Sequence, residues 1–597
     1  MKELTVGQKK VLQELTDYYD YARSSSVRQI WLQNYYNNLK FYYGDQWSEE
    51  LKQEFEDVKA FPLVVNKVEP SVNMYSSLLL NTSKRIAAKP TTTLADHGKR
   101  AEDINNFFYS VQTKNRFQSK SDQMRTDALI GGIGYLHFSY DEKTGEFFID
   151  WVNPNYVYPD PDDQTQHYEN PNFWVISYFT HNVNCKQRYS EYADFFDGLI
   201  GQESVTNAIN DTSFYTNIMD DELVWVKGRS IRLVEVYYKK NVKYYEGTII
   251  FPPSADDEFA QEQYFCTFDE EFAKSKMAPG TELKEKEGTQ IWKGVYCENV
   301  LLESGPIFAQ VPNQKHFPII PLCLKRNYYG MPYGVVDGLI PLSIAKNYIW
   351  TKTIHGLGSK YLLMEGNQDD IAKTGQIYLD QMAQKVGIIS LKNAKDAQLI
   401  NSENLLQYLF AALKAIDIEF EQRTQLHDEI EGEETNAVSG IAIRERATNS
   451  ARAQAVLYST YNDMLLSMGE LMLDTIKGIS DFKYAFKYSK DGKELSAVLD
   501  NEISTINFEI YTDIAAPFSS SYDEEIAKFE GLLNKPNPAF VMSHPLFLKK
   551  SGFDESDSVA LHEAYSEVTQ GQQEQAQVQQ EQQLQQQMQL EAQKQQR

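Results

Sequence analysis

Apolar residues recur at helical spacing along much of the first 130 residues. The pattern predicts a helix over residues 8–40, followed by helices over 64–80 and 99–130 that Pro90 separates. From residue 132 the spacing changes to short runs of β-branched and aromatic residues bounded by Gly, Asn, Asp and Pro. These runs predict an antiparallel sheet, with strands at Tyr135–Tyr140, Phe147–Val152, Trp174–Phe179, Ile231–Tyr238 and Val242–Phe251. Residues 253–290 are rich in charge and are predicted to form an exposed insertion.

The second half of the chain predicts two helices with a small unit between them. The first covers residues 335–355, where Pro341 either kinks the helix or marks its start. Residues 361–401 indicate a small α/β unit, with strands at Tyr361–Met364 and Gly387–Leu391 around a helix near 370–384. The second helix follows Ser402, a suitable N-cap, and its apolar stripe is Leu406, Leu409, Leu413, Ile416 and Phe420.

An acidic segment and a long helix come next. Residues 429–440 read EIEGEETNAVSG, and Ile441 to about Lys477 then predict a helix of more than roughly 50 Å. Strand patterns return in residues 482–513, and helical patterns at 522–534 and 555–568. From Gln570 onward, 16 of 28 residues are Gln. Two interpretations of this end stay open, a disordered tail or a polar helix that forms on self-association.

Composition and charge narrow the possible classes of function. The chain has 597 residues, of which 42% are hydrophobic and 13% aromatic, so it has enough apolar surface to build cores. Its net charge of −26 argues against a protein that grips nucleic acid through clustered Lys and Arg. The four cysteines form no CxxC pair, which indicates a reducing compartment. The sequence shows neither a secretory signal nor an apolar run long enough to span a bilayer, so we expect a soluble protein without membrane partners.

The motifs that suggest catalysis are weak. The GGIG sequence at Gly131–Gly134 enters a strand instead of opening a helix, so we interpret it as a close packing turn. HGLGSK at His355–Lys360 has the wrong spacing for a phosphate-binding loop. The carboxylates of Pro159–Asp163, combined with the Glu282–Lys284 segment, leave a metal-dependent nuclease as an alternative. We expect no catalytic residue, metal or cofactor.

Several motifs in order along the chain resemble one family. They are NYYNNLKFYYGDQW at Asn34–Trp47, FPLVVNKVEPSVN at Phe61–Asn73, Ala88–Pro90, DALIGGIGYLHFSYD at Asp127–Asp141, VNPNYVYPDP at Val152–Pro161, FPIIPL at Phe317–Leu322, YYGMPYGVVDGL at Tyr328–Leu339, and Ser439-Gly440 followed by IAIRER at Ile441–Arg446. Over roughly residues 30–520 this order resembles the portal protein of short-tailed double-stranded DNA bacteriophages. The Gln-Arg pair expected for the family near Leu342–Ile344 is missing, and the chain after residue 540 is short for the family.

The resemblance implies an α+β fold, the subunit of a portal-type ring. The implied regions are a mixed wing (1–330), a first stem helix (331–358), a small α/β clip (359–401), a second stem helix (402–430), a tunnel loop (429–440), a long wing helix (441–478), a wing return (479–535), a crown (536–569) and a Gln-rich helical barrel or tail (570–597).

The resemblance also implies a function and partners. The protein would form a twelve-fold ring at one capsid vertex of the virion, assembled in the host cytoplasm, through which double-stranded DNA is packaged and ejected. Its partners would be the terminase large subunit, a head-tail adaptor, the major capsid protein and a scaffolding protein. Another ring-forming connector or tail component stays an alternative.

Three groups of residues are the predicted sites of this channel. In a ring, the acidic run would form a girdle that repels DNA phosphates and keeps the duplex centred. The candidate residues are Asp428, Glu429, Glu431, Glu433 and Glu434 for the tunnel loop, Tyr378, Met382 and Ile388 for docking of the motor or adaptor at the clip, and Val578, Leu584 and Met588 for the seam of the barrel.

Overall fold

The computed structural model describes fourteen stretches of the chain. They are residues 5–57, 60–82, 86–91, 95–203, 224–251, 261–276, 282–358, 361–364, 397–400, 403–424, 455–479, 482–490, 493–500 and 506–512. The chain divides into two compact units, and the first comprises Met1–Glu434, Ala453–Lys487 and Ser496–Ile514. Nearly all described residues belong to this first unit. Helices and strands both contribute to it, as expected for an α+β fold.

The helix predicted over residues 8–40 is two helices. Helix α1 (Val6–Ser24) begins with a capping box in which Thr5 and Gln8 bond reciprocally, and α2 (Ser26–Tyr42) follows directly. Ser25 between them has φ −58° and ψ 121°, an extended conformation that interrupts the helical hydrogen bonds. The apolar periodicity continues across this single residue, which is why the sequence pattern predicted one helix. A short helix, α3 (Glu49–Asp57), comes next.

The region predicted to be helical over residues 99–130 is likewise divided. Helix α4 (Val68–Thr82) confirms the preceding prediction, and α5 (Ala95–Lys114) and α6 (Phe117–Gly131) follow strand β1 (Ile86–Pro90). Arg116 separates α5 from α6 with φ 51°, in the left-handed region that a continuous helix does not contain.

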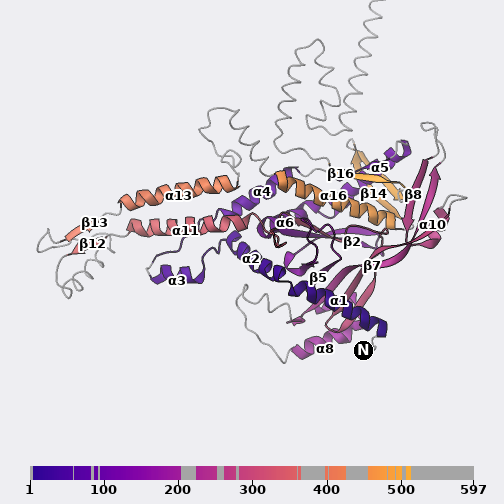
Figure 1. The fold of residues 1–597 in the computed structure, drawn as a ribbon, viewed down its shortest axis with the longest axis horizontal. Helices are drawn as coiled ribbons and strands as arrows, with labels where there is room; N and C mark the ends of the chain where they lie inside the picture. Colours follow the sequence, from indigo (N-terminus) through magenta and orange to yellow (C-terminus); the bar gives the residue numbers. More distant parts are fainter. Residues whose placement is uncertain are drawn as a thin grey trace, which may run out of the picture. The chain divides into compact units, whose positions relative to one another are not determined.

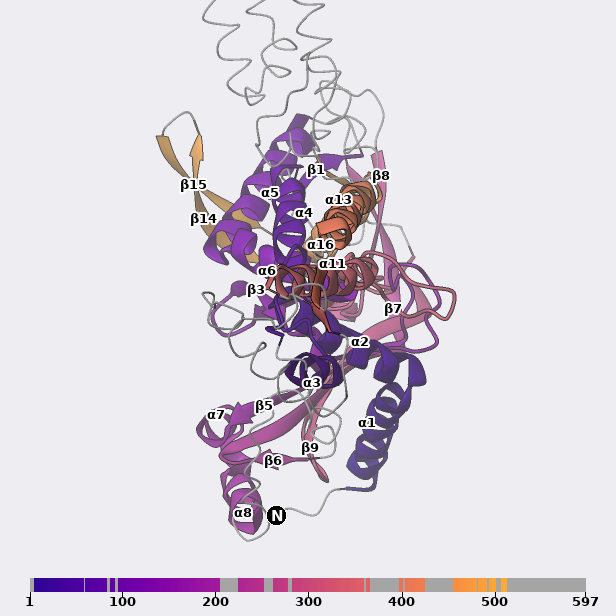
Figure 2. The same cartoon turned by 90° about the vertical axis from the view of Figure 1, so that its left-hand side faces the viewer.

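The predicted antiparallel sheet is confirmed and has seven strands. Its order is β10-β9-β7-β5-β4, and β6 and β8 pair with β7. The strands are β4 (Val157–Pro159), β5 (Phe173–His181), β6 (Val226–Lys227), β7 (Ser230–Phe251), β8 (Gln261–Thr267), β9 (Lys284–Cys297) and β10 (Val300–Pro306). Residues of α1, including Leu15, Tyr19 and Ala22, form a core with residues of β4, β5, β7, β9 and β10. Two short helices, α7 (Asn182–Arg188) and α8 (Ala193–Glu203), lie by β6 and contribute Cys185, Phe196 and Leu199 to a second core (Figure 2).

One expectation about this sheet is wrong. The predicted strands 231–238 and 242–251 are one strand, because Asn241 continues the ladder opposite Thr289. The charged segment 253–290 is mostly exposed where it is described, as predicted, and it contains β8, helix α10 (Glu270–Lys276) and the start of β9. Cross-strand ion pairs explain why so charged a sequence can be a strand. Lys243 pairs with Glu285 at 2.5 Å, and Lys286 with Glu246 at 2.7 Å.

A smaller sheet and the last long helix complete the first unit (Figure 1). Strands β2 (Ile133–Asp141), β3 (Glu146–Val152) and β11 (Ile319–Cys323) form an antiparallel sheet in the order β11-β2-β3. Helix α16 (Ala455–Gly478) packs beside β11, and also beside β16 (Phe508–Thr512), which pairs with β1. Strands β14 (Lys483–Lys490) and β15 (Lys493–Asp500) form a further two-stranded sheet. The predicted strand patterns in residues 482–513 are therefore confirmed where the chain is described.

The two helices predicted on either side of a small unit are present. Helix α11 (Val336–Gly358) continues through Pro341, and α13 (Glu403–Thr424) lies beside it (Figure 1). Strand β12 (Tyr361–Met364) follows α11 and pairs with β13 (Ala397–Ile400), which precedes α13. The strand predicted at Gly387–Leu391 and the helix predicted near 370–384 lie outside the described residues. So do residues 441–454 of the predicted long helix, whose remainder is α16.

Candidate functional site

Helices α11 and α13 run antiparallel and pack against each other. A Cβ on Gly338, near the start of α11, would lie 2.9 Å from Nε of Arg423, near the end of α13. Further along α11, Lys346 is 3% exposed, forms an ion pair with Asp417, and lies 6.0 Å from the ring centroid of Phe420. Leu413 and Phe420 are buried, so the predicted inner stripe of α13 faces α11 over its described part.

The opposite side of α13 carries a second stripe. This stripe has 3-4-3 spacing and is exposed at all four positions, which are Tyr408, Ala411, Ala415 and Ile418. Tyr408 is 75% exposed and Ile418 is 45% exposed. We call these four residues the outer stripe. Helix α11 covers only the inner stripe of α13, so the outer stripe is an apolar helix face without a packing partner in the described part of the chain.

Buried polar side chains attach α11 to the body of the unit. Asn347 is fully buried; its Oδ1 accepts from the Val65 amide at 2.8 Å and its Nδ2 donates to Gln46 Oε1 at 2.6 Å. One turn later, the Thr351 hydroxyl accepts from the Leu63 amide at 3.1 Å. These bonds are directional, so they fix both the position and the rotation of α11 against the segment before α4.

Two glycine-containing turns meet at the start of α11. A Cβ on Gly132 would lie 2.3 Å from the Tyr333 amide nitrogen, and Gly132 has φ 85°. A Cβ on Gly334 would lie 2.3 Å from the Leu129 carbonyl oxygen, and the neighbouring Val335 amide donates to that oxygen at 2.8 Å. The GGIG sequence is therefore the close packing turn that was predicted, and its partner is the turn that begins α11.

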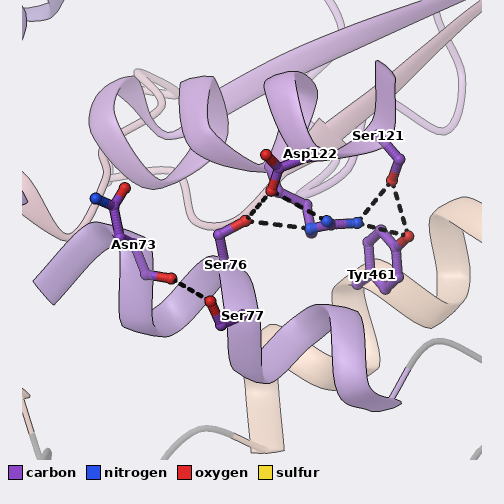
Figure 3. A network of polar contacts seen from close by, with 7 residues as sticks. Asn73, Ser76, Ser77, Ser121, Asp122 and Tyr461 are labelled. Atoms are coloured by element: carbon purple, nitrogen blue, oxygen red, sulfur yellow. Dashed lines mark hydrogen bonds and ion pairs between the residues drawn. The ribbon is translucent and has the colours of Figure 1, made fainter. Parts of the chain in front are cut away.

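Helix α4 bonds to the end of α13 and takes part in a buried network that includes α16. At the end of α13, the Tyr75 hydroxyl donates to the Thr424 carbonyl. Near the start of α16, Tyr461 joins a buried network around Arg125, which is fully buried (Figure 3). The Arg125 guanidinium donates to Ser121 Oγ at 2.9 Å, to Tyr461 OH at 3.2 Å, to Asp122 Oδ1 at 3.2 Å and to Ser76 Oγ at 3.3 Å. The network thereby joins α4, α6 and α16.

The residues that the sequence proposed for the channel lie outside the described residues. This holds for the acidic run, the clip candidates and the barrel seam, which are Asp428, Glu429, Glu431, Glu433, Glu434, Tyr378, Met382, Ile388, Val578, Leu584 and Met588. The structure fixes the two ends from which the acidic run departs, Thr424 and Ala455, and it does not test the run itself.

The carboxylates of the nuclease alternative have structural partners. Asp160 accepts from the Asp162 amide at 3.0 Å and from the Asn172 amide at 2.8 Å, and Asp163 accepts from Thr165 and Asn170. These bonds shape the loop between β4 and β5. In the part of the chain that the structure describes, no three His, Cys, Asp or Glu side chains gather as metal ligands would.

Glu235 in strand β7 of the seven-stranded sheet has a strongly lowered pKa. Burial alone would raise the pKa of Glu235, but Lys293, Arg188 and a hydrogen bond from Tyr178 lower it to about 2. Tyr178 donates to Glu235 at 2.7 Å, and Arg188 and Lys293 lie 3.1 and 3.3 Å from its oxygens. Glu235 is thus an ionised acceptor with several donors, which is a structural role.

Sequence reasoning missed the polar groups that attach α11. Ser343, Asn347 and Thr351 recur every fourth residue within the predicted helix, and all three are buried. Asn347 and Thr351 bond to the body of the unit, whereas the Ser343 hydroxyl donates to the Leu339 carbonyl of its own helix. A polar stripe at this spacing in an otherwise apolar helix was the available signal. Arg125 gave no comparable signal, because its partners come from three separate helices.

The comparison with known proteins supplies the family. No curated protein sequence matches the chain significantly. Among the described residues, no helix is long and apolar enough to cross a membrane. A family model described as "Phage P22-like portal protein" matches residues 17–597, in agreement with the order of motifs in the sequence. Because the match covers almost the entire chain, the protein belongs to the phage P22-like portal family, a family of structural virion proteins.

Proposed function

We propose that this chain forms a twelve-fold ring at one vertex of the capsid and that the ring is the channel for DNA packaging and ejection. In this proposal α11 and α13 are the stem helices of each subunit, and β12 and β13 belong to the clip between them. Family membership supports the general role. The outer stripe on α13 is the observation that supports self-assembly.

The outer stripe has the character of a helix-packing surface. Exposed Tyr and Ile side chains lose contact with water on association, at about 25 cal/mol per Å² of apolar area buried. Ala411 and Ala415 between them allow a neighbouring helix to approach closely. A contact between different faces of neighbouring subunits repeats around an axis and closes into a ring if the rotation per step divides a full turn. We infer that the outer stripe packs against the stem helices of the next subunit.

Substitution of the outer stripe tests this proposal. The double variant Tyr408→Asp and Ile418→Asp removes apolar surface and adds charge at exposed positions, where substitutions typically change stability within about 0.5 kcal/mol. We expect a folded chain that no longer forms rings, measured by native mass spectrometry and negative-stain microscopy. Lys414→Glu, a change of charge at an exposed position beside the stripe, is the control for altered charge without loss of apolar surface. Normal rings from the double variant would refute the assignment.

The partners follow from the same assembly. We propose that the region 359–401 docks the terminase large subunit during packaging and a head-tail adaptor afterwards, and that the body of the ring contacts the major capsid and scaffolding proteins. The acidic run at 428–434 would line the lumen, where repetition around the ring multiplies its charge. Its repulsion of DNA reaches about 8–10 Å at physiological salt, so the duplex would be centred without sequence-specific contact.

A further inference from the structure

A small pocket lies among elements that the proposed channel does not use. The first turn of α2, strands β2 and β4, and the loops at 160–168 and 326–332 enclose a cavity of about 50 Å³. Arg28 and Arg326 both line it, together with Trp31, Tyr168 and the α2 N-cap residue Ser25. The Ser25 side chain makes no capping bond to α2. The lining is thus rich in hydrogen-bond donors.

Arg28 is buried with part of its guanidinium unsatisfied. It is 6% exposed, and its Nη2 donates to the Asn155 carbonyl at 2.7 Å. Its Nε and Nη1 atoms are buried and have no hydrogen-bond partner. The guanidinium carbon lies 5.0 Å from the Trp31 ring and 4.5 Å from the Tyr158 ring. The rings favour a cation there, but they provide no acceptor for the free N–H groups.

The second arginine adds positive charge without a carboxylate partner. Arg326 donates to the carbonyls of Asp163, Thr165 and Gly330 at 2.5–2.8 Å. Asp160 also lines the pocket, but its oxygens accept from the Asp162 amide and from Asn172. Among the described residues, neither arginine forms an ion pair. The pocket therefore holds two guanidinium groups and no carboxylate that pairs with them.

A buried guanidinium whose N–H groups have no acceptor is destabilising, because those groups have lost their bonds to water. A bound anion would remove that cost and give the free N–H groups of Arg28 an acceptor, and charge-assisted bonds of this kind are the stronger ones. The cavity has room for roughly three to five waters, at 10–15 Å³ each, so one carboxylate group fits inside it.

We propose that this Arg28 pocket binds a single carboxylate group. The group comes either from an acidic side chain of a second copy of this chain or from a free small carboxylate. Tyr329 lines the pocket and is 77% exposed, and its neighbour Tyr328 is 97% exposed. Two exposed aromatic rings at the opening provide contact area for a protein surface. The second-copy source rests on the proposed ring, whereas the pocket itself does not.

Acetate is the probe for the pocket. Thermal unfolding of the full-length protein is followed in rising sodium acetate, at constant ionic strength maintained with sodium chloride. Acetate should raise the melting temperature, and Arg28→Met should raise the half-saturating acetate concentration at least about tenfold, as expected when a charge-assisted bond is lost. Arg28→Lys should retain part of the response. Arg232→Met, which removes a buried arginine that donates to Val224, Tyr19 and Ser177, should leave the half-saturating concentration unchanged.

Ring formation by the same variants identifies the source of the carboxylate. If a second copy supplies it, Arg28→Met lowers the fraction of rings at least about tenfold, Arg28→Lys restores part of it, and Arg232→Met does not reproduce the loss. If the source is a free carboxylate, the rings are unchanged and only the acetate response is lost. Equal effects of acetate and chloride, combined with normal rings from Arg28→Met, would overturn the proposal. Absence of rings in the unaltered protein would instead refute the proposed function, and the acetate response would still test the pocket.

Discussion

Replacement of Arg125 by Met should loosen α16 selectively. Met fills a similar volume but removes all four hydrogen bonds that the guanidinium donates to Ser76, Ser121, Asp122 and Tyr461. These bonds join α16 to α4 and α6, so the effect should be largest at the start of α16, next to the segment that carries the acidic run.

The expected cost is smaller than the sum of four bonds. Hydrogen bonds to charged groups contribute about 1.5–3 kcal/mol each, but two of the partners' contacts survive. Ser121 Oγ stays 2.8 Å from Tyr461 OH, and Ser76 still donates to Asp122 at 2.8 Å. Removal of a buried charge also recovers its desolvation cost. We therefore expect a loss of about 2–4 kcal/mol, somewhat below the usual 3–5 kcal/mol for one member of a buried pair.

Native-state hydrogen exchange measures this loss locally. Amides in the first half of α16 should exchange faster in Arg125→Met, while those of β5 and β7 should change little. A double-mutant cycle with Tyr461→Phe should give a coupling of at least about 0.5 kcal/mol, because the two side chains are in contact. Lys120→Met, on the same helix but partly exposed, should cost no more than about 1 kcal/mol. Additive effects in the cycle, or equal acceleration in α16 and the sheet, would refute the reasoning.

Four further predictions follow from the structure and the proposed channel. The pKa of Glu235 is lowered from 4.5 to about 2, so its stabilising effect should be complete above pH 4.5 and disappear as the pH falls to 2; Glu235→Gln should flatten this limb in acid-unfolding curves. Burial raises the pKa of Asp127 from 3.8 to about 6, so stability should increase as the pH falls through that interval, and Asp127→Asn should abolish the increase. Gly132→Ala combines φ 85° with a 2.3 Å backbone contact and should cost at least about 2 kcal/mol in thermal unfolding. The acidic run is tested by three simultaneous changes, Glu431→Lys, Glu433→Lys and Glu434→Lys. They should leave the rings intact but slow DNA packaging in vitro, and normal packaging rates across a range of salt would contradict the prediction that the acidic run repels DNA.

Periodicity predicted the type of most elements, and local conformation decided where they end. The helices and strands expected around α4, α11, α13, β2, β3 and β5 are present because their apolar faces are buried. The breaks at Ser25 and Arg116 were not predictable, since one residue with non-helical dihedral angles hardly disturbs the apolar pattern. The charged strand β9 was missed because its first residues lack an apolar alternation, and the β7 residues with which they pair lie about 40 positions earlier in the chain.

The candidate site was predictable in outline only. The helix, small unit and helix were visible in the sequence, and so were the motifs of the family. The attachment of α11 through Asn347 and Thr351 was not visible in the sequence. The backbone amides that bond to these side chains, at Val65 and Leu63, lie almost 300 residues earlier. Long-range pairing of this kind leaves no periodic trace in the chain.

The directional attachment of α11 has a geometrical consequence for a closed assembly. An apolar contact tolerates small rotations of one helix on another, whereas the bonds of Asn347 and Thr351 weaken steeply with angle. In a ring, an angular error at one subunit is repeated at every other. An error of about one degree per step would leave a ring of twelve open by roughly twelve degrees. In such a ring, the two amide contacts of Asn347 and Thr351 along α11 would set the angle between neighbouring subunits.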